Sequence, residues 1–270
     1  MRAYSSECSI CFCANDMIID DIVNLLATGL IPMLRISAMI IAAPLISLDV
    51  VSLPIRIVLA IVLTWVIYPL VEVPNLNPLS SEGMVMLVRE MFVGIAIAVT
   101  LQVANGALIL AGQALSMSMG LGMAQIMDPS AGTVPVLSSF LIIFSTLIFM
   151  GFGGHSLLFF LILQSFEFVP IGAAFDLDAV ILKVMAWTSM VFLGGILIAM
   201  PIMLTMLLVN LCLGIVTRSA PALNIFAVGF PAMILAGLAL LIINLTNIAH
   251  RTEWLWVEAF TTARDIWIGV

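Results

Sequence analysis

The sequence predicts an all-α membrane protein in which bent helical hairpins are joined by glycine- and proline-rich loops. Hydrophobic residues make up 64% of the 270 residues and charged residues only 9%, and the mean hydropathy is +1.30. A soluble domain is roughly 45–50 % apolar and about 25 % charged, so little of this chain is left for a separate soluble domain. The 18 glycines and 12 prolines interrupt the apolar runs, which indicates bent helices rather than simple spans.

The apolar runs and the residues that break them define the helical segments in order. We expect helices over about residues 17–47, 54–70, 81–117, 135–150, 156–169, 179–217 and 221–249. Pro54 suits the first position of a helix, and Ser80, Ser81 and Glu82 are candidate caps for the third segment. Small residues four apart, Gly94 with Ala98 and Ala107 with Ala111, predict close approach of a neighbouring helix.

Two of these segments carry signals for a change of direction. Gly151–His155 predicts a turn that folds the fourth and fifth segments into a hairpin. In the sixth segment, residues 184–217 carry no charge and are longer than the ~20 residues that a span needs. Gly194, Gly195 and Pro201 predict a bend within it.

The two ends of the chain differ from the helical domain at 17–249. Residues 1–16 lie outside the apolar pattern, so we interpret them as a leader that is disordered or precedes the native start, with Met17 as the alternative first residue. Residues 250–270 alternate Trp254, Trp256 and Trp267 with charged residues. This pattern predicts an amphipathic tail at the lipid interface, where tryptophan is favoured.

Charge and cysteine content argue against nucleic-acid and metal-binding functions. The formal net charge is −7 and the basic residues are scattered singly, so no patch exists to hold phosphates of a nucleic acid. The same scatter leaves the membrane orientation open. Cys8, Cys11 and Cys13 lie close together, but no histidine or fourth cysteine is near, and a closed zinc site needs four ligands. We therefore predict no metal and no other cofactor.

Residues 112–135 are the most unusual stretch of the chain. They follow and partly overlap an uncharged region, residues 91–127, and combine several glycines and methionines before Asp128. We expect a loop over 118–134. Its backbone cannot be satisfied by lipid, so it is either a tightly packed connector or a gate that lines a water-filled space. Asp128, followed by proline, is interpreted as a turn residue, with an ion-coupling carboxylate as the alternative.

Five polar or charged residues stand out within the apolar segments. Arg35 is costly in lipid, so it either makes a specific buried contact or extends to the interface. Arg89 and Glu90 are adjacent on a helix and face different ways, so they are not expected to pair with each other. His155 beside two glycines is interpreted as a cap or polar contact rather than a catalyst. Asn210 is either an interhelical hydrogen-bonding residue or a pore contact.

Together these features resemble the FliR/SctT family of type III secretion export-gate proteins. The resemblance covers most of residues 20–245, and the order of the motifs is more specific than any one of them. The motifs are Arg35 with Ala43-Pro44, Leu53–Arg56, Arg89-Glu90 with Gly94, Ala111–Gln113, Met119–Gly122, Asp128-Pro129, Pro135–Leu137, Gly154-His155, Ser165-Phe166, Pro170–Gly172, Met200-Pro201, Asn210 with Gly214, and Ala220–Pro231. The last motif favours the flagellar branch over the injectisome branch.

The resemblance implies a function that composition alone does not. Family members form a conical channel with FliP and FliQ subunits in the bacterial inner membrane, within the flagellar basal body. Unfolded flagellar proteins pass through it, and FlhB- and FlhA-type export proteins are further expected partners. In that family a loop matching roughly residues 113–128 plugs the closed pore. The candidate plug residues here are Gly112, Gln113, Met117, Met119, Gly120, Gly122, Met123, Met127 and Asp128.

Two other classes of function would require features that the sequence lacks. A secondary transporter with broken helices predicts inverted repeats and a polar site at the bilayer midplane, and the sequence contains no convincing repeat. An intramembrane enzyme needs a nucleophile with a base, or a metal site, on facing helices. His155 is the one histidine within the apolar region, so we predict that the protein is not an enzyme.

Overall fold

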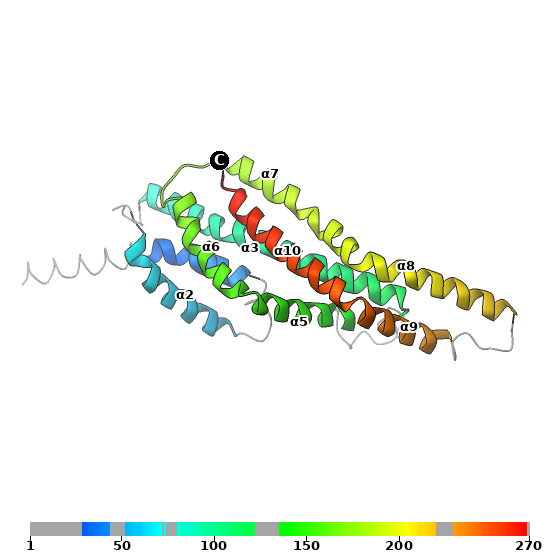
Figure 1. The fold of residues 1–270 in the computed structure, drawn as a ribbon. Helices are drawn as coiled ribbons and strands as arrows, with labels where there is room; N and C mark the ends of the chain where they lie inside the picture. Colours follow the sequence, from blue (N-terminus) through cyan, green and yellow to red (C-terminus); the bar gives the residue numbers. More distant parts are fainter. Residues whose placement is uncertain are drawn as a thin grey trace, which may run out of the picture. The chain divides into compact units, whose positions relative to one another are not determined.

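The computed structural model describes residues 29–43, 52–71, 73, 80–121, 135–219 and 229–268, and these parts of the chain form helices and turns without strands (Figure 1). They divide into two compact units. Unit one lies within residues 1–99 and 162–176, and unit two within residues 100–161 and 177–270. The predicted leader at 1–16 lies outside the described residues.

Unit one contains the first helices of the chain. Its elements are the helical segment Gly29–Ala42, α2 (Leu53–Ile67), the short 3-10 helix η1 (Tyr68–Leu70), the first part of α3 (Ser81–Ser118) and the last part of α6 (Gly154–Phe168). Proline occupies the start of α2, as its sequence predicts. The Ser80 hydroxyl accepts a hydrogen bond from the Gly83 amide at 3.0 Å, which caps the first turn of α3.

Unit two contains the longer helices. Its elements are the remainder of α3, α5 (Val136–Gly151), the first part of α6, α7 (Leu177–Thr188), α8 (Met190–Ser219), α9 (Phe230–Ile243) and α10 (Leu245–Asp265). α10 packs against α5, α8 and α9, and α8 also packs against α9. In Figure 1, α8 runs beside α9 and α10.

The core of unit two is centred on an aromatic cluster. Trp256 is buried, its indole nitrogen donates to the Ser145 hydroxyl at 2.8 Å, and its ring meets Phe149 edge-on with centroids 4.9 Å apart. The satisfied indole explains why tryptophan can be buried here. The Lys183 ammonium donates to the carbonyls of Ile266 and Ile268, each at 3.0 Å, and so neutralises the C-terminal end of α10.

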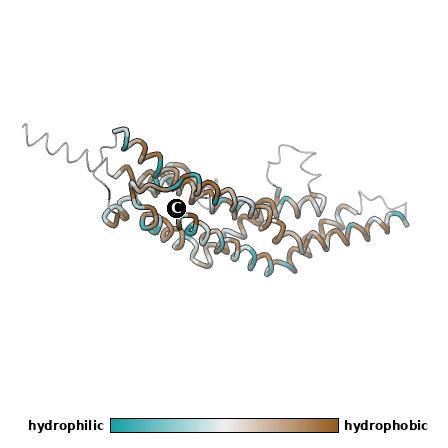
Figure 2. The backbone as a smooth tube through the Cα atoms, turned by 90° about the horizontal axis from the view of Figure 1, so that it is seen from above, coloured by the Kyte–Doolittle hydropathy of each residue, from teal (hydrophilic) through white to brown (hydrophobic). Residues whose placement is uncertain are grey.

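Several helices are long and apolar enough to cross a membrane. Leu53–Leu70, Ser81–Ser118 and Leu177–Ser219 qualify individually, and counting each of two bent helix pairs as one span raises the total to five. Figure 2 shows the predominance of apolar residues along these helices. α3 has 38 residues, so at 1.5 Å per residue it is ~57 Å long, nearly twice the ~30 Å of a hydrocarbon core.

The predicted hairpin at Gly151–His155 is wrong. α5 and α6 are bent relative to each other by 73°, whereas a hairpin would reverse the chain. α5 continues to Gly151 and α6 starts at Gly154, so the change of direction is confined to Phe152 and Gly153. Gly153 has φ of +76°, a left-handed conformation that glycine adopts readily.

The helix is not interrupted at Gly194, Gly195 and Pro201, where the sequence predicts a bend. The break lies at Ser189, between α7 and α8, and α8 continues through Pro201. Gly194 and Gly195 are buried and let α3 approach α8, because a Cβ at Gly195 would lie 3.0 Å from the carbonyl oxygen of Ala107. These glycines serve close packing rather than bending.

The chain breaks again near its C-terminal end. α9 and α10 are bent by 61° at Asn244. The expected start of the tail at residue 250 therefore falls inside a continuous helix, α10, which begins at Leu245. Trp254 is exposed, while Trp256 and Trp267 are buried within the protein.

Candidate functional site

The C-terminal end of α3 has the geometry of a Schellman motif. The Leu121 amide donates to the Ser116 carbonyl at 3.0 Å and the Gly120 amide to the Met117 carbonyl at 3.1 Å. Gly120 has φ of +79°. These are the paired six-to-one and five-to-two hydrogen bonds, with a left-handed glycine, that end many helices. Gly120 therefore fixes where α3 stops and in which direction the chain leaves it.

The neighbouring helices of unit two hold this helix end in place. Met119 is fully buried, and a Cβ at Gly237 of α9 would lie 2.5 Å from the Met119 Cγ. The Asn210 side chain of α8 donates its amide hydrogen to the Ser118 carbonyl at 3.3 Å, which satisfies one of the free carbonyls of the last turn. The end of α3 is thus fixed by both packing and hydrogen bonding.

The candidate plug residues differ in burial, and Gly120 is half-buried. Gly112 and Met119 are buried, whereas Gln113 and Met117 are exposed. Because Gln113 and Met117 are four residues apart on α3, they share one helix face. Residues 112–118 are helical, so the first residues of the candidate plug belong to α3 and not to the loop expected over 118–134. Gly122, Met123, Met127 and Asp128 lie outside the described residues.

Gly112 is required for the contact between α3 and α5. A Cβ at this position would collide with the backbone of Ser138, whose hydroxyl donates to the Ile109 carbonyl of α3 at 3.0 Å. The two helices therefore touch through backbone atoms, a contact that small residues allow in membrane proteins.

We expect Gly112→Ala to destabilise the protein by about 1–3 kcal/mol, because the added methyl group forces the backbones of α3 and α5 apart. Gly106→Ala is the matched control on the same helix, since its Cβ would meet only Val191 side-chain atoms at 3.5 Å. The control should be neutral or stabilising by up to about 1 kcal/mol. Thermal unfolding of the two purified variants measures the difference, and equal melting temperatures would contradict the close contact.

Arg35 and Glu90 form a buried ion pair in unit one. The Arg35 Nε donates to the Glu90 Oε2 at 2.7 Å, and the two side chains are only 1% and 3% exposed. The helical segment Gly29–Ala42 carries the arginine and α3 the carboxylate. A charge at such depth requires a charged or strongly hydrogen-bonding partner.

The other nitrogens of Arg35 bind carbonyls at the C-terminal end of α6. Nη1 donates to the Ser165 carbonyl at 2.7 Å and Nη2 to the Val169 carbonyl at 2.9 Å. The guanidinium also lies 4.4 Å from the centroid of the Phe166 ring, within the range of a cation–π contact. One side chain therefore connects three segments that are far apart in the sequence.

Glycine makes this arrangement possible at the backbone level. A Cβ at Gly94, one turn after Glu90 in α3, would collide with the carbonyl oxygen of Arg35. Because Gly94 has no Cβ, the helical segment Gly29–Ala42 approaches α3 closely enough for Arg35 to reach Glu90.

Arg89 and His155 lie in a different environment. Arg89 is exposed and lines a cavity with Ser81 and Glu82 at the start of α3. His155 is exposed in the first turn of α6. The structure therefore brings Arg35 and Glu90 together and leaves these two side chains at the surface of the described chain.

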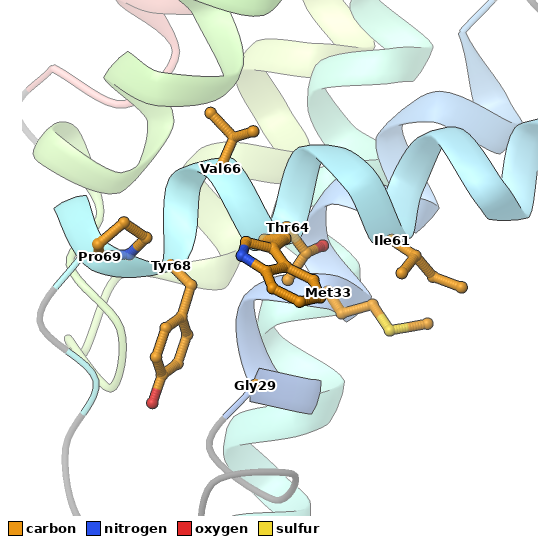
Figure 3. Close-up of a pocket in the computed structure, with 8 residues that line it drawn as sticks. Gly29, Met33, Ile61, Thr64, Val66, Tyr68 and Pro69 are labelled. Atoms are coloured by element: carbon orange, nitrogen blue, oxygen red, sulfur yellow. The ribbon is translucent and has the colours of Figure 1, made fainter.

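An apolar groove lies beside the exposed face of α2. The groove has a volume of about 580 Å³, and Figure 3 shows Gly29 and Met33 on one side and Ile61, Thr64, Tyr68 and Pro69 on the other. Trp65 also lines the groove and is 82% exposed. Among the described residues, no group of three or more histidine, cysteine, aspartate or glutamate side chains is placed to hold a metal ion.

Sequence reasoning singled out Arg35 and Glu90 separately but did not pair them. They are 55 residues apart, and each sits in its own apolar helix with no local sign of the other. The available signal was that Arg35 stands alone in an apolar segment and that Glu90 was not expected to pair with the adjacent Arg89, since buried charges of opposite sign require partners.

Comparison with known proteins gives a consistent result. The family described as Bacterial export proteins, family 1, matches residues 26–259. The chain is 32% identical over 236 residues to the Flagellar biosynthetic protein FliR of Escherichia coli (strain K12), which covers 87% of this chain and 90% of that protein. It is 31% identical over 247 residues to the protein of the same name from Pectobacterium carotovorum subsp. carotovorum, covering 91% and 95% of the two chains. The corresponding protein of Aquifex aeolicus (strain VF5) is 30% identical over 226 residues, covering 82% and 86%.

Proposed function

The chain belongs to family 1 of the bacterial export proteins, the family that includes FliR, and from this membership we propose that it forms, with FliP and FliQ subunits, the channel of the flagellar protein export gate. The family assignment supports a role in the flagellar export apparatus, and the apolar helices fit a membrane location. Unfolded flagellar proteins are the proposed cargo, and FlhB- and FlhA-type proteins are proposed further partners. We place the channel in the inner membrane, within the basal body.

The observation that carries this proposal is the length of exposed apolar surface on α7 and α8. Large apolar side chains are exposed from Leu177 to Val216. This stretch lies within the helical range Leu177–Ser219, which is longer than a single membrane span requires. At 1.5 Å per residue it extends ~58 Å, whereas a hydrocarbon core is ~30 Å thick. Lipid can cover only part of such a surface, so the remainder requires protein neighbours.

We expect the chain to behave poorly alone and to be stabilised by its partners. Produced alone in mild detergent it should aggregate, whereas co-production with FliP and FliQ should yield one larger complex that contains all three. Size-exclusion chromatography with subunit-specific detection measures this. A stable, monodisperse monomer that does not associate with FliP or FliQ would contradict the proposed assembly.

We further propose that the stretch beginning at the C-terminal end of α3 closes the channel. Support comes from the fixed helix end at Gly120, from the exposed Gln113 and Met117 on one helix face, and from the methionines in the sequence that follows. Methionine side chains adapt to irregular apolar surroundings, and a narrow apolar constriction excludes water and ions without strong bonds.

A further inference from the structure

A cavity lies between α8 and the start of α10, within unit two. Its volume is about 440 Å³. One wall is apolar and consists of Leu197, Met200 and Leu204 of α8, together with Pro201. The other wall carries polar side chains, among them Asn247, His250 and Arg251 of α10. The cavity is therefore apolar on one side and polar on the other.

The polar wall carries positive charge without a carboxylate. No aspartate or glutamate is among the residues that line the cavity. Asn247, His250 and Arg251 are exposed, and within the described ranges none of the three side chains has a hydrogen-bond or ion-pair partner in the structure. An arginine fork next to amide and imidazole donors is suited to the oxygens of a phosphate group.

The apolar wall continues away from the cavity along α8. Leu204, Leu207 and Leu211 are exposed, and their spacing of three and four residues places them along one side of the helix. A ligand that matches both walls has an anionic head and a long apolar tail. This shape distinguishes the cavity from a site for a free anion, which would use only the polar wall.

The two helices beside the cavity differ in charge. α9 contains apolar residues with no charge, whereas charged residues begin in α10 with Arg251 and Glu253. The cavity lies beside this transition at Asn244. The polar wall of the cavity therefore belongs to the charged part of α10, whereas its α8 wall lies within an uncharged stretch, residues 184–217.

From these observations we propose that the cavity binds an anionic phospholipid, with its phosphate on Arg251, His250 and Asn247 and an acyl chain along the apolar face of α8 at Leu204. A bilayer supplies such phosphates at high local concentration, and basic recesses between membrane helices bind acidic headgroups. The bound lipid would cover the middle of the exposed apolar surface of α8 and leave the rest of it for protein neighbours.

The test uses the full chain in its complex with partner subunits, purified in mild detergent. Native mass spectrometry measures retained phospholipid, and titration of delipidated complex with phosphatidylglycerol, phosphatidylcholine or inorganic phosphate measures affinity. We expect Arg251→Gln to weaken phosphatidylglycerol binding about tenfold through loss of the charge-assisted fork. Arg264→Gln, an exposed arginine on the same helix outside the cavity, should leave binding unchanged.

The outcomes separate the proposed lipid from other occupants. Thermal unfolding of lipid-free Arg251→Gln should match the parent protein, which shows that the loss of binding is not a loss of folding. Equal phosphatidylglycerol affinity in Arg251→Gln and the parent would overturn the proposal, as would inorganic phosphate binding as tightly as phosphatidylglycerol. An Arg251→Cys variant that crosslinks to an acidic segment of a partner subunit, with no change in lipid retention, would assign the cavity to that subunit instead.

Discussion

Replacing Arg35 with methionine should destabilise the protein by about 3–5 kcal/mol, because Glu90 would keep a buried charge without its partner. Glu90→Leu should cost a similar amount, since the arginine would then be the unpaired ion. The two side chains are 1% and 3% exposed, so water cannot replace the missing partner. Thermal unfolding of the purified complex, with complex yield as a second measure, tests both variants.

The double variant tests whether Arg35 contributes to stability beyond its ion pair with Glu90. Arg35→Met with Glu90→Leu removes both charges, so it should be more stable than either single variant. It should still fall short of the parent protein, because the Val169 carbonyl loses its donor, at about 1–3 kcal/mol for a buried acceptor left unpaired. The Ser165 carbonyl loses one of two donors and keeps the Val169 amide at 3.1 Å. If the double variant equals the parent, the two carbonyl contacts contribute nothing to stability.

Arg89→Leu is the matched control for charge removal. Arg89 is next to Glu90 in the sequence but is exposed, so the change should alter stability within about 0.5 kcal/mol. A large effect of Arg89→Leu on assembly, with unchanged stability of the chain itself, would instead assign Arg89 to a contact with a neighbouring subunit. Equal stability of Arg35→Met and Arg89→Leu would contradict the buried-pair account.

Gly120→Val should make the channel leak ions and should reduce export. Gly120 has φ of +79°, and a left-handed conformation costs a non-glycine residue about 1–2 kcal/mol, with more strain for a branched side chain. The strain arises from the backbone, because a Cβ would meet Phe230 at an ordinary 3.5 Å. We expect the Schellman hydrogen bonds to be lost and the stretch that follows to leave its position.

The measurement is ion conductance of cells that produce the variant together with its partner subunits, beside secretion of flagellar proteins. Gly214→Ala is the control, because Gly214 lies in α8 with nothing within 4 Å of an added Cβ. Deleting residues 117–123 is a less clean test, since that deletion also removes the buried Met119. Tight membranes and normal export in Gly120→Val would mean that this stretch is a packed connector rather than a seal.

The sequence by itself determined the features that depend on neighbouring residues. Its apolar composition defined an all-α membrane protein, and the expected third helix over about 81–117 agrees closely with α3 at Ser81–Ser118. Pro54 and Ser80 were correctly placed at helix starts, because proline geometry and side-chain capping act within one turn. The same local rules suggested glycine-dependent structure near Gly120.

Only the tertiary structure decided which distant residues meet. The pairing of Arg35 with Glu90, the burial of Trp256 on Ser145, and the use of Gly112 and Gly195 for packing all join positions far apart in the chain. A glycine in a helix is equally compatible with a bend or with a close neighbour, and only the neighbour distinguishes the two. For this reason the bends at Phe152–Gly153 and Asn244 and the partners of the buried charges follow from packing, which acts between helices rather than along them.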